Sequence, residues 1–460
     1  MANQEQIGRS DESLLEDQSA PVSTARLPKG VYNNFTFEFF NAVMWQSFSS
    51  PVVLFIRQAG ASAFIVGALS AIPLLLMPLT LAGSRQVERI GYRRLALICW
   101  TLRWLFSGIL IPVALMDWLG YWRVVIALGV VFLFHLTRNF GVSANNAWLT
   151  SIIGPHQRGL YLSRTQLFSN MGSVGAFLLI GAMLGSNPAF SQFSPVFVLG
   201  VIGGLLSSIF MARIAPPPVT RVVTVKHSEQ TSRLTFWQGV KRCFAQPGFT
   251  SFVVVQTFYG VAFFAIPSLS LIYMREKVHI APGTILYFST AGVFGATLAS
   301  LFWGKWIDKR GIYSLQLLAF LGLSFNSILW FCIGLFGATA ANLALAALVN
   351  FLSTIWISAL NMSQTHSIMS LAPDEDRVLF QNIATLMTYF SQALAPMLWG
   401  MLLDMLDAHR FTFMLGGLEV SSYRFFFLIS MLAGLVGCVV LFRLQRVERK
   451  AMAVREEYAE

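Results

Sequence analysis

Charged residues are scarce in this chain. Asp, Glu, Lys and Arg make up 12% of its 460 residues, whereas 55% of the residues are hydrophobic. A soluble globular protein carries roughly 25% charged residues, because its surface must be covered by groups that water hydrates. The shortage excludes a water-facing surface over most of a protein of this size. It predicts that much of the outer surface faces lipid.

Cysteine is also rare, and motifs typical of metal sites and enzymes are missing. The four cysteines are scattered and no C-x-x-C pair occurs, which argues against a disulfide framework or a zinc site. No GxxxxGK[ST] phosphate-binding loop is present, so ATP-driven transport within this chain is not expected. The loops carry no nucleophile–base signature. We therefore expect no enzymatic activity, no cofactor and no metal.

The net charge of +11 does not indicate nucleic-acid binding. The basic residues lie between apolar runs rather than in one patch, and this is where residues that orient membrane spans belong. The N-terminal segment 1–30 is polar and partly acidic. It lacks the basic start and apolar core of a cleavable signal peptide, so we expect it to form a disordered cytoplasmic tail.

Long apolar runs are what the sequence has in abundance. A helix of roughly 20 residues crosses the hydrocarbon core of a membrane, and twelve runs reach this length. Six lie in the first half: 32–57, 61–82, 95–117, 124–152, 160–185 and 195–213. Six lie in the second half: 249–274, 283–303, 314–337, 342–369, 379–405 and 424–443. Backbone groups must be paired in lipid, so we predict an all-α membrane protein with twelve transmembrane helices.

The basic residues predict the orientation of these helices. If both termini are cytoplasmic, the tails and the loops on the same side hold 24 of the 32 Lys and Arg residues. The opposite side holds six: Arg57, Arg123, Arg275, Lys277, Arg410 and Arg424. Cytoplasmic loops carry the excess of Lys and Arg. We therefore predict a multi-pass protein of the cytoplasmic (inner) membrane with both termini in the cytoplasm.

A polar stretch divides the chain between the sixth and seventh runs. It opens with three prolines and contains "TFWQGVKRCFA", which could form a short amphipathic helix at the membrane surface. The predicted segments are a tail at 1–30, a six-helix bundle at 31–215, a cytoplasmic linker at 216–247, a second six-helix bundle at 248–443 and a cytoplasmic tail at 444–460.

The two halves repeat each other. The stretch "LAGSRQVERIGYRR" ends the second apolar run, and "FWGKWIDKRGIY" ends the eighth. The interval from Glu88 to Asp308 is the same as the interval from Gly91 to Gly311. A six-plus-six chain whose halves have the same orientation is a parallel duplication, which is one of the known transporter architectures.

These stretches resemble the loop motif of the major facilitator superfamily, which reads roughly G-x-x-x-D-R/K-x-G-R/K. The second copy fits at four positions: Gly304, Asp308, Lys309 and Gly311. In the first copy Glu88 replaces the aspartate, and Ser84 stands where the first glycine belongs. The resemblance covers residues 31 to 443 and implies two six-helix bundles related by a parallel repeat.

The resemblance also implies a role for the two loops. In the family such loops form charge contacts between helix ends, which close the cytoplasmic side and break when it opens. The implied gate residues are Glu88, Arg89, Gly91, Gly304, Asp308, Lys309 and Gly311. Glycine serves the reversal of the chain. The alternative is that these residues only determine topology.

Ionisable residues within apolar runs indicate function, because a charge inside a membrane is costly. Glu38 lies in the first span and Arg138 near the middle of the fourth. The stretch around Arg138 resembles the family's R-x-x-x-G proton-coupling pattern, although Gly141 follows after three residues rather than four. We predict a Glu38–Arg138 couple whose protonation changes during transport. The alternatives are a static ion pair or two side chains that reach interface water separately.

Two further ionisable residues lie in the predicted spans. Arg103 lies two turns into the third span, and we expect its side chain to snorkel or to contact a neighbouring loop. His366 lies near the end of the tenth span, close in sequence to Asp374, Glu375 and Asp376. We expect it to form a hydrogen bond on the cytoplasmic side.

The resemblance implies that the first, fourth, seventh and tenth helices line a central cavity, with parts of four others. The candidate substrate contacts are Asn41, Trp45, Gln256, Tyr259, Trp356, Asn361, Tyr389 and Gln392. The alternative for each is a hydrogen bond between helices. These residues contain no cluster of like charges, so we expect a neutral, amphiphilic or singly charged small organic substrate.

Together these features predict a secondary active transporter that works by alternating access and is coupled to protons. A glycine-rich run, "GSVGAFLLIGAMLG", resembles an exporter motif without its final proline and favours export. The expected partners are a small-molecule substrate, membrane lipid and protons, for a monomer that binds no nucleic acid. The alternatives are a non-transporting carrier, assembly factor or sensor of the same fold, and a proton-independent facilitator.

Overall fold

The computed structural model describes residues 29–153, 157–216, 236–246, 248–335, 339–371 and 377–457. In these residues the chain is almost entirely helical, with one two-stranded hairpin. The expected all-α class is confirmed. Most of the predicted N-terminal tail (1–28) and much of the predicted linker (217–235) lie outside the described residues.

The first half folds into a bundle of eight helical segments. They are α2 (Tyr32–Gln58), α3 (Ala63–Leu75), α4 (Leu79–Ile90), α5 (Tyr92–Gly108), α6 (Leu110–Leu115), α7 (Trp122–Ile152), α8 (Arg158–Leu184) and α9 (Phe193–Ala212). Short 3-10 turns at Lys29–Val31, Asp117–Leu119 and Phe190–Gln192 precede α2, α7 and α9. The predicted third span comprises α5 and α6.

The predicted second span, 61–82, is not one continuous helix. Its apolar part is the 13-residue α3, and α4 begins after Pro78. Proline has no N–H to donate, so the helical ladder is interrupted there. In the described residues eleven helices are long and apolar enough to cross a membrane, and α3 is a shorter apolar helix beside them. The count of twelve therefore holds only when α3 and α4 are taken as one span.

The second half repeats the pattern. Its elements are α10 (Phe236–Ala245), α11 (Phe249–Tyr259), a π-helical turn (Gly260–Phe264), α12 (Ile266–Glu276), α13 (Pro282–Arg310), α14 (Ile312–Cys332), α15 (Thr339–Leu371), α16 (Arg377–Ala408), β1 (Thr412–Leu415), β2 (Leu418–Ser421) and α17 (Ser422–Glu457). Pro267 explains the irregular turn, because its ring clashes with the carbonyl four residues earlier in a regular helix. The strands pair antiparallel, with Thr412 opposite Ser421.

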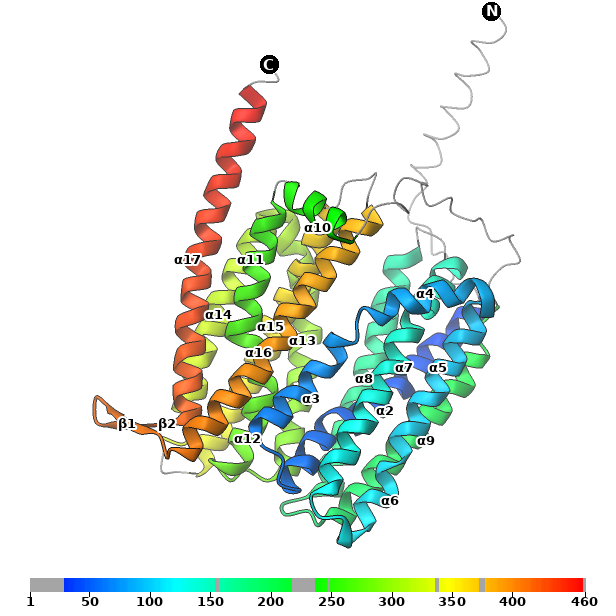
Figure 1. Ribbon diagram of the computed structural model, residues 1–460, viewed down its shortest axis with the longest axis vertical. Helices are drawn as coiled ribbons and strands as arrows, with labels where there is room; N and C mark the ends of the chain where they lie inside the picture. Colours follow the sequence, from blue (N-terminus) through cyan, green and yellow to red (C-terminus); the bar gives the residue numbers. More distant parts are fainter. Residues whose placement is uncertain are drawn as a thin grey trace, which may run out of the picture.

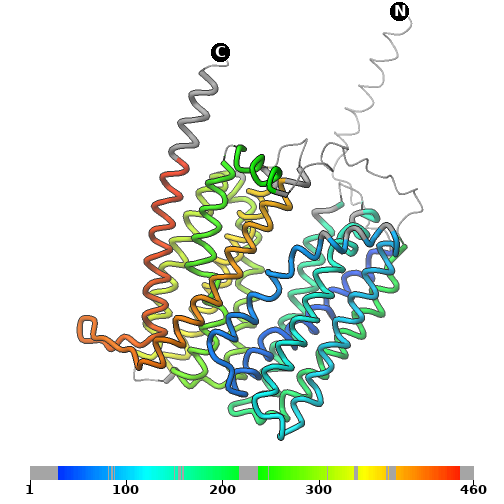
Figure 2. Tube along the Cα trace, in the orientation of Figure 1, coloured from blue at the N-terminus to red at the C-terminus, as the bar shows by residue number. Residues whose placement is uncertain are grey.

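The two halves form two helix bundles that lie side by side, and Figure 1 shows them in different colours of the sequence scale. In the first bundle α2 packs against α8 and α9, and in the second α13 packs against α15 and α14 against α17. α10 lies at one end of the molecule and the β1–β2 hairpin at the other (Figures 1 and 2). We call these the α10 end and the hairpin end.

The bundles pack against each other mainly through two helix pairs, α3 with α16 and α8 with α13, and α12 also contacts α2 and α3. Glycine allows the first pair to approach closely: a Cβ atom added at Gly67 would lie 2.1 Å from the carbonyl oxygen of Pro396. An apolar core of buried side chains from both bundles continues through this contact. The approach of two helix backbones at small residues is typical of membrane helix packing.

The last helix extends beyond its predicted span. α17 runs without a break from Ser422 to Glu457, through most of the segment that was expected to be a C-terminal tail. Figure 1 shows it projecting past the other helices at the α10 end. The helix therefore continues where its apolar pattern stops.

Candidate functional site

A polar cavity of about 520 Å³ lies inside the first bundle and borders α13 of the second. Four of the residues proposed from sequence line it: Glu38, Asn41, Trp45 and Arg138. Side chains of α2, α5, α7 and α8 surround them, and most carry an amide, a hydroxyl or a charge. The cavity is therefore a site for polar groups.

A chain of hydrogen bonds connects a cation to an anion in this cavity. The guanidinium of Arg103 donates from Nη2 to Asn41 Oδ1. Asn41 in turn donates from Nδ2 to the Glu38 carboxylate over 3.2 Å. An amide thus stands between the two charges and is oriented by both of them.

Arg103 is deeply buried, which overturns the expectation that it snorkels. Its residue is 2% exposed, and the guanidinium lies over the rings of Trp100 and Phe134, 4.9 and 5.3 Å from their centroids. The reason is a close approach of α5 to α7, because a Cβ added at Gly141 would lie 2.5 Å from Cys99 Cβ. Gly141 therefore acts as a packing glycine that places Arg103 beside the cavity.

Arg138 lies in the same cavity but forms no direct ion pair with Glu38 in the described residues. Its Nη1 donates to Asn139 Oδ1 over 3.3 Å, and its guanidinium lies 5.0 Å from the Trp45 ring centroid. The predicted Glu38–Arg138 couple is therefore not a direct ion pair in this conformation. Glu38, Arg103 and Arg138 line one cavity, and Glu38 accepts a hydrogen bond from Asn41.

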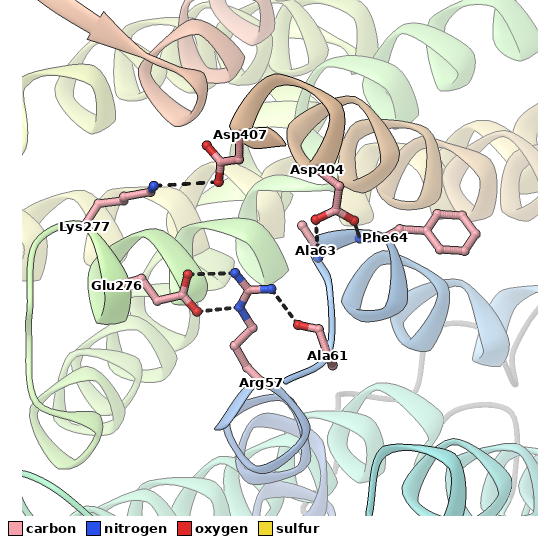
Figure 3. Close-up of polar contacts among 8 residues, drawn as sticks. All are labelled: Arg57, Ala61, Ala63, Phe64, Glu276, Lys277, Asp404 and Asp407. Carbon is pink, nitrogen blue, oxygen red and sulfur yellow. Dashed lines mark hydrogen bonds and ion pairs between the residues drawn. The ribbon is translucent and has the colours of Figure 1, made fainter. Parts of the chain in front are cut away.

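At the hairpin end an ion pair joins the two bundles. Arg57, at the end of α2, donates to both carboxylate oxygens of Glu276 at the end of α12 (Figure 3), and the Nη2–Oε2 distance is 2.7 Å. Its Nη1 also donates to the Ala61 carbonyl over 2.5 Å. The two side chains are 21% and 31% exposed. A bidentate pair of this kind constrains both position and angle.

A second polar contact joins α16 to the start of α3. The Asp404 carboxylate accepts hydrogen bonds from the backbone N–H groups of Ala63 and Phe64, each over 2.8 Å (Figure 3). These N–H groups lack partners within α3, because the first turn of a helix has none. A negative charge there is also favoured by the helix dipole. Asp404 thus caps a helix of the opposite bundle.

Further hydrogen bonds between the bundles involve α3, α12, α13 and α8 with the residues that follow it. The N–H of Gly283 donates to the Gly185 carbonyl over 2.9 Å, and Arg275 Nη2 donates to Asn187 Oδ1 over 3.2 Å. Ser70 and Ser268 share a hydrogen bond of 2.7 Å about two turns in from the start of α3. Asn170 of α8 and Thr297 of α13 bond at greater depth.

Comparison with known proteins identifies this architecture. A sequence model described as "Major Facilitator Superfamily" matches residues 35–325 and again 252–457. The chain belongs to the major facilitator superfamily. The resemblance read from the two loop motifs is thereby confirmed, and the chain is a multi-pass membrane protein with the transporter fold of this family.

Solved transporters share the fold at low sequence identity. A variant of the nucleoside transporter NupG is 12% identical, with 90% of this chain and 100% of that chain covered and a TM-score of 0.71. A D-xylose-proton symporter is 13% identical, with 90% and 96% covered and a TM-score of 0.66. A POT family transporter in complex with 5-aminolevulinic acid is 14% identical, with 92% and 96% covered and a TM-score of 0.67. No curated protein matches this chain in sequence.

The gate residues proposed for this superfamily member lie at the α10 end. Gly91 and Gly311 have φ angles of +85° and +80°, as expected for glycines that reverse the chain between two helices. A Cβ atom added at Gly304 would lie 3.5 Å from Met362 Cε. Arg89 and Lys309 are exposed. The side chains of Glu88 and Asp308 lie outside the described residues, so their gate role stays a prediction.

The candidate contacts from the second half do not line the cavity of the first bundle. Gln256 and Tyr259 are buried, Gln392 donates to Gln364 over 3.5 Å, and Asn361 is exposed. Trp356 stacks on Trp303 with ring centroids 6.0 Å apart.

Tyr389, the remaining second-half candidate, is half-buried on α16 and also does not line this cavity. For His366, which is exposed, the acidic stretch 374–376 lies outside the described residues. The expected hydrogen bond of His366 therefore stays a prediction.

Sequence reasoning missed the contacts at the hairpin end. Arg57, Glu276 and Asp404 lie at the ends of predicted spans, where a charge needs no special explanation. One signal was available: Arg57 and Lys277 are separated by the same interval as the two loop motifs. This interval marks Arg57 as part of the internal repeat, but it does not identify Glu276 as its partner, because Lys277 carries the same charge as Arg57.

Proposed function

We propose that this chain is a secondary active transporter that moves a small organic solute across the cytoplasmic membrane by alternating access. The observation that carries the proposal is the arrangement of polar groups. Side-chain and backbone contacts join the two bundles at the hairpin end, and a polar cavity with three charged side chains lies deeper, beside α13. A cavity closed from one side is what one half of a transport cycle requires.

The orientation predicted from Lys and Arg assigns the two sides. With both termini in the cytoplasm, the hairpin end faces outward and the α10 end faces the cytoplasm. The ion pair of Arg57 with Glu276 then closes the outer side. The exposed Arg89 and Lys309 fit a cytoplasmic gate that is open in this conformation. In the opposite conformation the outer contacts break and the loop residues engage.

Proton coupling is proposed for Glu38. Burial of a carboxylate favours its neutral form, whereas two nearby guanidinium groups favour the ionised form. A substrate that binds in the cavity changes the exposure and partners of these groups, so it can take up or release a proton from Glu38. We retain export as the proposed direction, on the glycine-rich run in α8.

The test is solute-driven proton movement in proteoliposomes that contain the purified protein and a pH-sensitive dye. Glu38→Gln removes the titrating group and is expected to abolish proton movement while solute exchange continues. Asp117→Asn is the matched control, because Asp117 is a 94% exposed carboxylate outside the cavity. Exchange without proton movement in the wild type would indicate a facilitator. The absence of any exchange would favour a non-transporting carrier, assembly factor or sensor.

A further inference from the structure

We infer that the cavity of the first bundle binds a small polar organic monoanion, a hydroxy or sugar acid with one carboxylate, and that Arg103 and Trp100 hold the carboxylate. The inference rests on the proposed transport function and names the class of its substrate. It is carried by buried polar atoms that have no partner in the described residues.

Three of these atoms belong to residues that line the cavity. Arg103 Nε, Trp100 Nε1 and Asn145 Oδ1 are buried and have no hydrogen-bond partner in the described residues. Their residues are 2%, 5% and 7% exposed. A buried polar atom without a partner is destabilising. A site that keeps several such atoms together is arranged for a ligand that completes their hydrogen bonds.

The free donors include a cationic guanidinium, which favours an anionic acceptor in the ligand. Guanidinium and indole N–H groups are donors only, so they require an acceptor. Among the described residues, Arg103 donates only from Nη2, to Asn41 Oδ1 and to Met44 Sδ at 3.5 Å. Its Nε–H has no partner among the described residues, and two oxygens of a carboxylate suit a guanidinium edge.

The charge balance of the cavity limits the ligand to one negative charge. Arg103 and Arg138 are the cations that line it, and Glu38 is the anion. When Glu38 is ionised, one positive charge remains uncompensated. A buried charge needs a partner or an equivalent set of hydrogen bonds. A monoanion supplies this partner, whereas an organic cation would add to the excess.

The remaining walls specify the rest of the molecule. Asn145 Oδ1 accepts hydrogen bonds, and the amides of Gln46, Gln166 and Asn170 also line the cavity. The three amides each donate one hydrogen bond within the protein, to Ser173, Asn170 and Thr297. Asn145 Oδ1 and the second N–H of each amide can pair with hydroxyl groups, and a hydrocarbon chain offers them no partner. The wall chemistry thus favours a hydroxylated acid over a fatty or aromatic acid.

The test compares acids with their uncharged counterparts on the whole purified protein. Glycolate, lactate, glycerate, gluconate and glucuronate are each paired with the matching amide or sugar alcohol in a thermal-shift titration. Folded-state binding raises apparent stability by mass action. We expect at least one acid to stabilise the protein and its uncharged partner to have no effect. Equal shifts from acid and partner, or no shift from any acid, would overturn the inference.

Two variants locate the carboxylate. Arg103→Gln should weaken binding of the active acid about tenfold or more, since a hydrogen bond to a charged group is lost. Trp100→Phe keeps the ring, removes only the N–H and should weaken binding less. Arg123→Gln is the control, because Arg123 is a buried arginine of the same bundle, 4% exposed and stacked on Phe190 outside the cavity. Full binding by both Arg103→Gln and Trp100→Phe would refute the assignment.

Transport of the same compounds separates the two proposals. An acid that binds through Arg103 but does not cross proteoliposomes would disprove the transport function and leave the anion site standing. A neutral solute that crosses, while no acid binds, would support transport and reject the anion site.

Discussion

The two helix junctions at the hairpin end are related by the internal repeat but are built differently. Ala63 at the start of α3 and Gly283 near the start of α13 occupy corresponding positions, separated by the same interval as the two loop motifs. The first N–H donates to the Asp404 carboxylate, and the second donates to the Gly185 backbone carbonyl. Both are first-turn N–H groups that their own helices leave unpaired.

The packing next to these contacts follows the same rule. Gly67 of α3 lies against the Pro396 carbonyl of α16, and at the corresponding position Tyr287 of α13 lies against Gly181 of α8. In each junction a glycine leaves room for a group of the neighbouring helix. The glycine is Gly67 of α3 in the first junction, whereas in the second it is Gly181 of α8, the helix against which α13 packs. The repeat thus preserved the geometry of approach and not the residues that provide it.

The difference has a physical consequence. A carboxylate cap adds charge to the hydrogen bonds and can be removed by one substitution, whereas a backbone carbonyl cannot. The junction of α3 with α16 is therefore the one that side-chain chemistry can regulate. Three of the following changes test this with one reporter: a Ser70→Cys variant without native cysteines, labelled by a membrane-impermeant maleimide.

The largest effect is expected from filling the close approach of α3 to α16. Gly67→Val would place atoms where the Pro396 carbonyl lies and should destabilise the junction by about 3 kcal/mol. Labelling of Ser70→Cys should then approach its maximal rate. Gly129→Ala is the control, because an added Cβ meets nothing within 4 Å. Slow labelling in Gly67→Val would mean that the two helices do not meet as closely as described.

The next effect concerns the two loop glycines, which should respond alike. Gly91 and Gly311 combine positive φ with ψ angles of 147° and 166°, a region almost reserved for glycine. Replacement of either by alanine should lower stability by about 2 kcal/mol, seen as similar decreases in the thermal unfolding midpoint. An effect at only one of the two positions would show that the repeat is not equivalent there.

A smaller effect is expected from breaking the ion pair between bundles. Arg57→Gln removes the bidentate contact with Glu276, and because both side chains are partly exposed the loss should be about 1 kcal/mol. Labelling of Ser70→Cys should rise about fivefold. The double variant with Glu276→Gln should add little to Arg57→Gln. Additive effects would contradict a direct interaction.

The smallest effect is expected from the charge of the Asp404 cap. Asp404→Asn keeps an acceptor for Ala63 and Phe64 but loses the charge near the helix N-terminus, which contributes about 0.5 kcal/mol. Labelling should rise by roughly twofold. High salt should reduce the difference from wild type, because screening weakens the dipole term. A salt-independent change would show that geometry rather than charge matters.

Several elements were predictable from local features. Apolar length located the spans, and the glycines of both loops adopt the expected backbone conformation. The break between α3 and α4 was missed although Pro78 marks it, because an apolar run conceals an interruption of the helix. Of the proposed site residues, Glu38, Asn41 and Trp45 of α2 line one cavity with Arg138 of α7, and spacings of three and four residues put the first three on one helix face.

Contacts across long sequence separations were not predictable in the same way. The sequence shows how deep Arg103 lies in its span, and this depth predicted that it snorkels. The sequence does not show the rotation of α5 about its axis, which turns Arg103 into the bundle. The partner of Arg57 lies 219 residues away, and Asp404 caps a helix 341 residues earlier. These pairings depend on how the bundles dock.

The sequence by itself determined that the chain is a duplicated membrane transporter of twelve predicted spans, because apolar length, loop charge and turn glycines are local properties of the chain. The tertiary structure alone decided which charges share the cavity and which residues join the two bundles at the hairpin end. The reason is that helix rotation and the docking of the two bundles arise from packing between residues far apart in sequence, such as Gly141 against Cys99 and Gly67 against Pro396.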